Sequence, residues 1–195
     1  MSAIDDLKEE IKETLSKSKV PEDYLHAQNT VEWLRKIKPD ADEILIVAAL
    51  GHDVERAIEE RKIRREDFSD FDTFKEAHAQ NSARILKEKM EKYPIGNAQK
   101  QRILRIVTRH ETGGDPESDL IRDADALSFF DVNLPLYFRR EGRERAMERS
   151  RWGYERLSPG IKDWVAGFTY DNEALNEIVR ALSHDCKGES NTPKK

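Results

Sequence analysis

The sequence has little of what disulfide-stabilised, membrane-spanning or β-rich proteins require. Its 195 residues include one cysteine, 9 glycines and 7 prolines. The single Cys186 excludes an internal disulfide. The longest purely apolar run, 44–50, is far shorter than the roughly 20 residues that cross a bilayer. The scarcity of turn-forming residues also disfavours a many-stranded β-sandwich. Helices are therefore the leading expectation, and we predict no membrane span.

A basic surplus is missing as well, because the formal net charge is -5 at pH 7. Nucleic acids are bound through basic faces that contact phosphates, so we expect no stable nucleic-acid binding. The start of the chain, Met-Ser-Ala-Ile-Asp-Asp, lacks the basic and apolar stretches of a secretory signal. Together with the single cysteine, this predicts a cytoplasmic protein whose partners are small molecules. The sequence leaves its oligomeric state open.

Apolar residues recur at intervals of three and four through most of the chain, which is typical of amphipathic helices. The predicted helices cover 4–18, 21–38, 42–52, 73–91, 98–111 and 117–132, with two or three more over 135–183. The segment 42–52 is apolar nearly all round, as a central helix would be, and Asp40 is predicted to cap its N-terminus. Residues 53–72 are charged and irregular and are predicted to form a long connection. We therefore predict an all-α fold, a single-domain helical bundle over 1–185 with a flexible tail over 186–195.

Four of the five histidines share one property, because each lies on the apolar face of a different predicted helix. They are His26, His52, His78 and His110. One histidine on such a face is usually a hydrogen-bonded core residue, but an apolar bundle has no ordinary use for four imidazoles. Asp53 directly follows the second histidine, and Asp125 lies on another mostly apolar helix, where a buried carboxylate needs a partner such as a cation. The pattern predicts a metal site between helices. His184 is predicted to be structural.

The order of these residues resembles the HD superfamily of metal-dependent phosphohydrolases. The phrases Ala-Ala-Leu-Gly-His-Asp and Arg-Asp-Ala-Asp-Ala-Leu look like that family's second and last signatures. The phrase Ala-His-Ala-Gln-Asn-Ser-Ala-Arg-Ile-Leu looks like its optional middle histidine helix. The resemblance covers 26–125, within a motif core at 22–132. Asp123 lies about 200° around the helix from Asp125, and the signature favours Asp125 as the ligand.

The resemblance implies an HD-type bundle with a metal site between its helices. The implied ligands are His26, His52, Asp53, His78, His110 and Asp125. Members that have only the outer four of these residues bind one ion, whereas binuclear members add the two middle histidines and use Asp53 as a bridge. Imidazoles and carboxylates suit divalent iron, manganese, cobalt, nickel or zinc better than calcium or magnesium. The sequence does not choose among these metals or between one and two ions.

The implied activity is that of a phosphohydrolase or phosphodiesterase. It would hydrolyse a small phosphate ester, such as a nucleotide, by attack of a metal-bound hydroxide that Asp53 orients. Glu55 is a candidate proton donor to the leaving oxygen and Arg56 a candidate phosphate clamp, although both could be ordinary loop charges. Arg139, Arg140 and Arg143 are further candidates for binding the substrate's phosphate. The glutamates between and after these arginines fit a solvated, salt-bridged helix as well.

Two other functions stay open at this stage. Some HD-type proteins, including myo-inositol oxygenase and its phosphonate-cleaving relatives, resemble the same six-ligand pattern and use two irons to activate oxygen. A di-iron oxygenase that acts on a small polyol or phosphonate is therefore an alternative. A metal-containing module that binds a nucleotide without turnover is another. The sequence does not identify the substrate.

Overall fold

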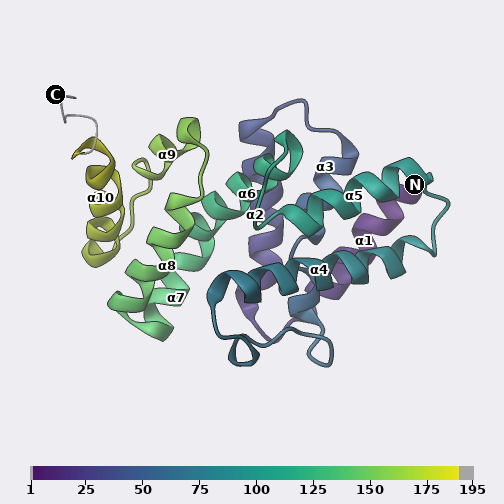
Figure 1. Cartoon of the computed structure of the whole chain (residues 1–195), viewed down its shortest axis with the longest axis horizontal. Coiled ribbons are helices and arrows are strands. Elements are labelled where there is room, and N and C mark those ends of the chain that lie inside the picture. Colours follow the sequence, from purple (N-terminus) through teal and green to yellow (C-terminus); the bar gives the residue numbers. More distant parts are fainter. Residues whose placement is uncertain (1, 189–195) are drawn as a thin grey trace. The chain divides into compact units, whose positions relative to one another are not determined.

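The computed structural model describes the backbone of residues 2–188 and the side chains of residues 2–183 (Figure 1). No strand occurs in this described part, whose regular elements are all helical, so the predicted all-α class is confirmed. The chain divides into two compact units, Met1–Asp125 and Ala126–Lys195, where the sequence predicts one domain over 1–185. The division has a physical basis, because one hydrophobic cluster draws its residues only from Leu7 to Ala124. Residues 189–195 of the predicted tail lie outside the described residues.

The first unit is built from helices of 9–20 residues, and all but one of their connections are short. They are α1 (Ala3–Leu15), α2 (Pro21–Ile37), α3 (Glu43–Gly51), α4 (Phe71–Met90), α5 (Asn97–Arg109) and most of α6 (Pro116–Ser128). The connection predicted over 53–72 holds two short 3-10 turns, η1 (Val54–Ala57) and η2 (Arg65–Asp67). Among the helices described, none has both the length and the apolar character that a membrane span requires.

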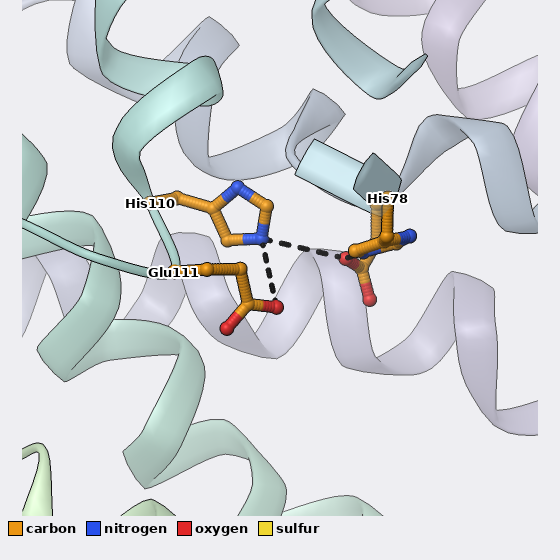
Figure 2. A group of neighbouring side chains, drawn as sticks. His78, His110 and Glu111 are labelled. Atoms are coloured by element: carbon orange, nitrogen blue, oxygen red, sulfur yellow. Dashed lines mark hydrogen bonds and ion pairs between the residues drawn. The ribbon is translucent and has the colours of Figure 1, made fainter. Parts of the chain in front are cut away.

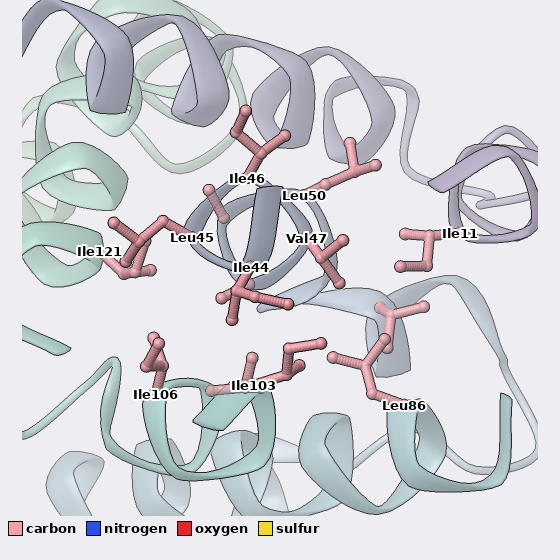
Figure 3. Close-up of a cluster of buried hydrophobic side chains, with 14 of the residues drawn as sticks. Ile11, Ile44, Leu45, Ile46, Val47, Leu50, Leu86, Ile103, Ile106 and Ile121 are labelled. Carbon is pink, nitrogen blue, oxygen red and sulfur yellow. The ribbon is translucent and has the colours of Figure 1, made fainter. Parts of the chain in front are cut away.

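Helix α3 lies at the centre of the first unit, where it packs against α1, α2 and α5. All of its residues from Ile44 to Gly51 are buried, which explains why the segment is apolar on every side. Figure 3 shows its side chains radiating toward Ile11, Ile103 and Ile121 of the surrounding helices. Each buried Leu or Ile contributes about 1.5–3 kcal/mol relative to an exposed one, so this cluster positions the end of α3 firmly.

The two ends of α3 depend on particular residues. The sequence predicts Asp40 as the N-cap, but the structure places Asp42 there, and its carboxylate accepts hydrogen bonds from the backbone N–H groups of Ile44 and Leu45 at 3.1 and 3.0 Å. Asp40 is wrong for this role because its side chain is exposed and pairs with Lys38. At the other end, a Cβ on Gly51 would lie 2.9 Å from Cδ2 of Leu86, so glycine allows α3 to approach α4.

The second unit contains helices of 7–16 residues. They are α7 (Leu134–Glu141), α8 (Arg143–Glu155), α9 (Pro159–Val165) and α10 (Glu173–Gly188). The sequence predicts two or three helices over 135–183, but these described elements are more numerous because Gly142, at φ 84°, separates α7 from α8. Glycine adopts this left-handed conformation without the strain that a Cβ would cause. Helix α10 runs past the predicted start of the tail at 186.

A π-turn, η3 (Phe129–Asn133), connects α6 to α7. The backbone N–H of Leu134 donates to the carbonyl of Phe129, and the next residue in this register, Pro135, has no N–H to offer to the carbonyl of Phe130. The hydroxyl of Tyr170 donates to that carbonyl at 2.6 Å instead. This bond ties the segment before α10 to the π-turn, inside the second unit.

Candidate metal centre

The six predicted ligands converge inside the first unit, and each is at most 8% exposed. They are His26 in α2, His52 at the C-cap of α3, Asp53 directly after it, His78 in α4, His110 at the C-cap of α5 and Asp125 in α6. Five helices therefore contribute to one buried place. The predicted inward direction of the four histidines is confirmed.

A first donor group consists of His26, His52 and Asp125. One ligand atom of each lies within 4.8 Å of the others, which is close enough for a shared ion. Nε2 of His26 is 3.0 Å from Oδ1 of Asp125, and Nε2 of His52 is 3.6 Å from the same oxygen. The group offers two imidazole nitrogens and one carboxylate, a set that suits first-row transition metals.

A second donor group consists of Asp53, His78, His110 and Glu111, again within 4.8 Å of one another. Nε2 of His110 is 3.3 Å from Oε1 of Glu111 and 3.7 Å from Oδ1 of Asp53. Figure 2 shows His110 and Glu111 side by side, with His78 entering from another helix. The sequence analysis missed Glu111. Its position next to His110, a predicted ligand at a helix end, is the signal that could have indicated it.

The carboxylate of Asp53 connects the two groups. Its Oδ1 is 2.6 Å from Nε2 of His78 and 3.6 Å from Nε2 of His52, and its Oδ2 is 4.0 Å from Nε2 of His26. A residue of one group therefore lies beside two residues of the other. This is the location that a bridging carboxylate between two ions requires.

The orientation of two imidazoles tests whether the residues fit a metal. Nδ1 of His52 donates to the carbonyl of Ala49 at 2.8 Å, and Nδ1 of His110 donates to the carbonyl of Val107 at 2.7 Å. Because a carbonyl only accepts, each ring carries a proton on Nδ1, and in its neutral form it keeps its lone pair on Nε2. Neither Nε2 has a hydrogen-bond partner in the described part of the chain, and both atoms are buried. Buried nitrogen lone pairs directed at carboxylates fit a metal ion well.

The groups also influence one another's protonation. Burial lowers the pKa of His52, but Asp53 and Asp125 outweigh it and raise the pKa to about 9. Burial raises the pKa of Asp53, but His52, His78 and Arg56 hold it well below its ordinary value. Burial likewise raises the pKa of Asp125, and His26 and His52 lower it further than burial raises it. The carboxylates are therefore ionised and suited to a cation.

A family model described as a domain of unknown function, DUF4202, matches residues 1–179. The chain belongs to this family. No curated protein and no solved structure matches it. The match includes every residue of the two donor groups of this DUF4202 chain.

Glu55 lies behind His78 in the DUF4202 chain and is 1% exposed. Its Oε1 accepts from Nδ1 of His78 at 2.6 Å. Its Oε2 accepts from the backbone N–H of Ile63 at 2.7 Å and from Nδ2 of Asn81 at 3.0 Å. Both oxygens are therefore engaged away from the donor atoms. In this geometry the Glu55 carboxylate orients His78, a candidate ligand, and the predicted role of Glu55 as a proton donor stays a prediction.

Arg56 lies at the edge of the donor groups, with its side chain 34% exposed. Its Nε is 3.3 Å from Oδ1 of Asp23, and its Nη1 is 3.4 Å from Oδ2 of Asp53. The hydroxyl of Ser18 donates to Asp23 at 2.6 Å, which fixes that carboxylate in turn. Arg56 therefore lies beside the donor groups, and its predicted contact with phosphate stays a prediction.

The other predicted substrate residues belong to the second unit. Nη2 of Arg143 is 2.7 Å from Oε2 of Glu177, and Nε of Arg140 is 3.3 Å from Oε1 of Glu141. Arg139 is exposed near the end of α7. Arg140 and Arg143 therefore form ion pairs with glutamates of their own unit. Phosphate binding by the three arginines stays a prediction.

Two smaller predictions concern acids and histidines near the motif. Asp125 belongs to a donor group, whereas Asp123, although 3% exposed, belongs to neither. The choice of Asp125 over Asp123 therefore agrees with the donor groups. The side chain of His184 lies outside the described residues.

Proposed function

We propose that this chain is a metal-dependent phosphohydrolase of HD type that hydrolyses a small phosphate ester, such as a nucleotide. The observation that supports it is the meeting of two buried donor groups at Asp53, whose oxygens lie 2.6 Å from Nε2 of His78 and 3.6 Å from Nε2 of His52. The six predicted ligands would hold one or two ions of iron, manganese, cobalt, nickel or zinc. Such an ion lowers the pKa of a bound water toward about 7 and polarises a phosphoryl oxygen.

The chain's own residues support an anionic substrate. The guanidinium of Arg56 is held by Asp23 and Asp53 and stays 34% exposed, so it presents a fixed cation beside the ligands. A guanidinium forms two parallel hydrogen bonds to phosphate oxygens, which orients the group as well as attracting it. The ligands themselves are buried, and this limits the access of bulk water to the reacting atoms.

Metal content and turnover, measured together, test this function. Protein purified without chelator should contain about two transition-metal ions per chain by elemental analysis. A screen of phosphate monoesters and nucleotides should reveal release of inorganic phosphate. Asp53→Asn should abolish this release. Asp40 is 82% exposed and belongs to neither donor group, so Asp40→Asn should leave the release unchanged.

Other outcomes would contradict the proposal. Iron together with oxygen uptake and no phosphate release would indicate the di-iron oxygenase that acts on a polyol or phosphonate. Binding of a nucleotide without any turnover would indicate a metal-containing binding module. Phosphate release that persists in Asp53→Asn would place the reaction elsewhere in the chain.

A further inference from the structure

Glu111 is placed as a metal ligand would be, although it is not one of the six ligands of the proposed function. It directly follows the C-cap histidine of α5 and is 3% exposed. Its Oε1 is 3.3 Å from Nε2 of His110, a buried nitrogen that has no hydrogen-bond partner in the described residues. Its carboxylate therefore lies where that nitrogen's lone pair points.

Lys75 explains how a carboxylate can stay charged in this buried place. Lys75 is 6% exposed, lies one turn before His78 in α4, and its ammonium forms an ion pair with Oε1 of Glu111. Burying an ion pair removes both charges from water, and the free-energy cost of this desolvation is about as large as the gain from the attraction between the charges. The ion pair between Lys75 and Glu111 is therefore expected to contribute little to the stability of the fold. Its location among three potential ligands favours a role in metal binding.

Glu111 gives the two donor groups the same composition when Asp53, which lies between them, is left aside. The first group offers two imidazole nitrogens and one carboxylate, from His26, His52 and Asp125. The second group without Asp53 would offer only the nitrogens of His78 and His110. Glu111 adds the carboxylate that makes the two sets equivalent, with Asp53 between them.

We propose that Glu111 is a ligand of the second ion, in addition to Asp53, His78 and His110. The proposal rests on the metal site of the proposed function. The second ion is then held by two imidazoles and two carboxylates, and Lys75 balances the charge of one of those carboxylates. Loss of the Glu111 carboxylate should weaken the second ion selectively and leave the first ion in place.

Titration of metal-free protein with Co²⁺ tests this, because the visible absorption of Co²⁺ reports its ligands and no substrate is needed. Wild type should bind two ions. Glu111→Gln should bind the second ion at least about tenfold more weakly and change its spectrum. His26→Ala should lose the other ion, and the double variant should bind almost none. Glu91→Gln, whose side chain is 64% exposed, is the matched control and should behave as wild type.

Two results would overturn the proposal. Glu111→Gln that binds both ions with wild-type affinity and spectrum would show that Glu111 is not a ligand. If Glu111→Gln does not fold, Glu111→Asp can be used, because it keeps the charge on a shorter side chain and should still weaken binding of the second ion. Wild-type affinity of Glu111→Asp for both ions would likewise show that Glu111 is not a ligand. A wild type that binds two ions but releases no phosphate would defeat the proposed function alone and leave Glu111 as a ligand.

Discussion

His52 and His110 use the same local arrangement although they belong to different helices. Each lies at a helix C-cap, where the last carbonyls have no intrahelical donor, and each ring donates from Nδ1 to the carbonyl three residues earlier. The helix end thereby fixes the ring and directs Nε2 toward the carboxylates. Periodicity predicted the face on which these residues lie, but it could not predict which nitrogen would be presented.

Glu55 is a buried hydrogen-bond partner of His78, whereas the sequence predicts that it donates a proton to the leaving oxygen. Because its carboxylate accepts from Nδ1 of His78 at 2.6 Å, Glu55→Gln should weaken binding of the second ion by about 10–100-fold. Phosphate release should recover when metal is supplied in excess. Metal titration and phosphate release, measured on the same samples, check this.

The sequence-based role predicts a different result for the same variant. If Glu55 donated a proton to the leaving oxygen, Glu55→Gln would bind both ions with wild-type affinity and stay inactive at any metal concentration. Lys87→Ala changes an exposed residue of α4, the helix that carries His78; it serves as the control and should alter neither measurement.

At the scale of helices, the connection between α1 and the end of α4 depends on Glu10. Its carboxylate accepts from Nζ of Lys89 at 3.0 Å, from Nζ of Lys92 at 2.7 Å and from the hydroxyl of Tyr93 at 2.7 Å. Burial raises the pKa of Glu10, but Lys92, Tyr93 and Lys89 outweigh it and lower the pKa to about 2. Glu10 therefore joins segments that are distant in sequence.

Glu10→Gln should lower the free energy of unfolding by about 1–2 kcal/mol at pH 7, because hydrogen bonds to a charged group are lost. The pKa in the folded state lies below the ordinary value of 4.5, so this contribution is complete above pH 4.5 and disappears as the pH falls toward 2. Urea unfolding of both proteins from pH 7 to pH 2.5 should show the difference shrinking over that interval.

Glu13→Gln provides the comparison on the same helix. Glu13 is 67% exposed and pairs with Lys17 four residues later in the chain, so its replacement should leave the free energy of unfolding nearly unchanged. A difference between Glu10→Gln and wild type that stays constant down to pH 2.5 would show that the carboxylate charge does not stabilise the contact.

At the scale of the whole molecule, all residues of the two donor groups belong to Met1–Asp125. Metal binding should therefore stabilise the first unit in particular. Stabilisation is about 2.7 kcal/mol for an ion whose free concentration is 100-fold above its Kd. Removal of the ions with a chelator should lower the unfolding midpoint of that unit, and addition of Co²⁺ or Zn²⁺ should restore it.

Tryptophan fluorescence can follow the first unit separately. The chain has 3 tryptophans, and only Trp33 lies in the first unit. In the variant Trp152→Phe/Trp164→Phe, the chelator should shift the unfolding curve reported by Trp33. Asp125→Ala should reduce the shift. An unchanged curve in chelator would contradict metal binding by the donor groups.

The helices of the first unit could be predicted well from the sequence because their apolar residues follow one period. The N-cap residue of α3 was harder to predict, because Asp40 and Asp42 both precede the helix. Only the backbone path decides which carboxylate reaches the backbone N–H groups of Ile44 and Leu45. In the second unit, Gly142 ended a helix that the surrounding sequence favours. Single residues at helix ends are where local patterns carry the least information.

The sequence by itself determined the all-α class and the inward direction of the four histidines and Asp125, because helical periodicity fixes which side chains face the core. Only the tertiary structure decided that Asp53 lies between two donor groups, that Glu55 supports His78, and that Glu111 joins the second group. These relations depend on distances between separate helices. Periodicity along one helix contains no information about such distances, which are set by how the helices pack.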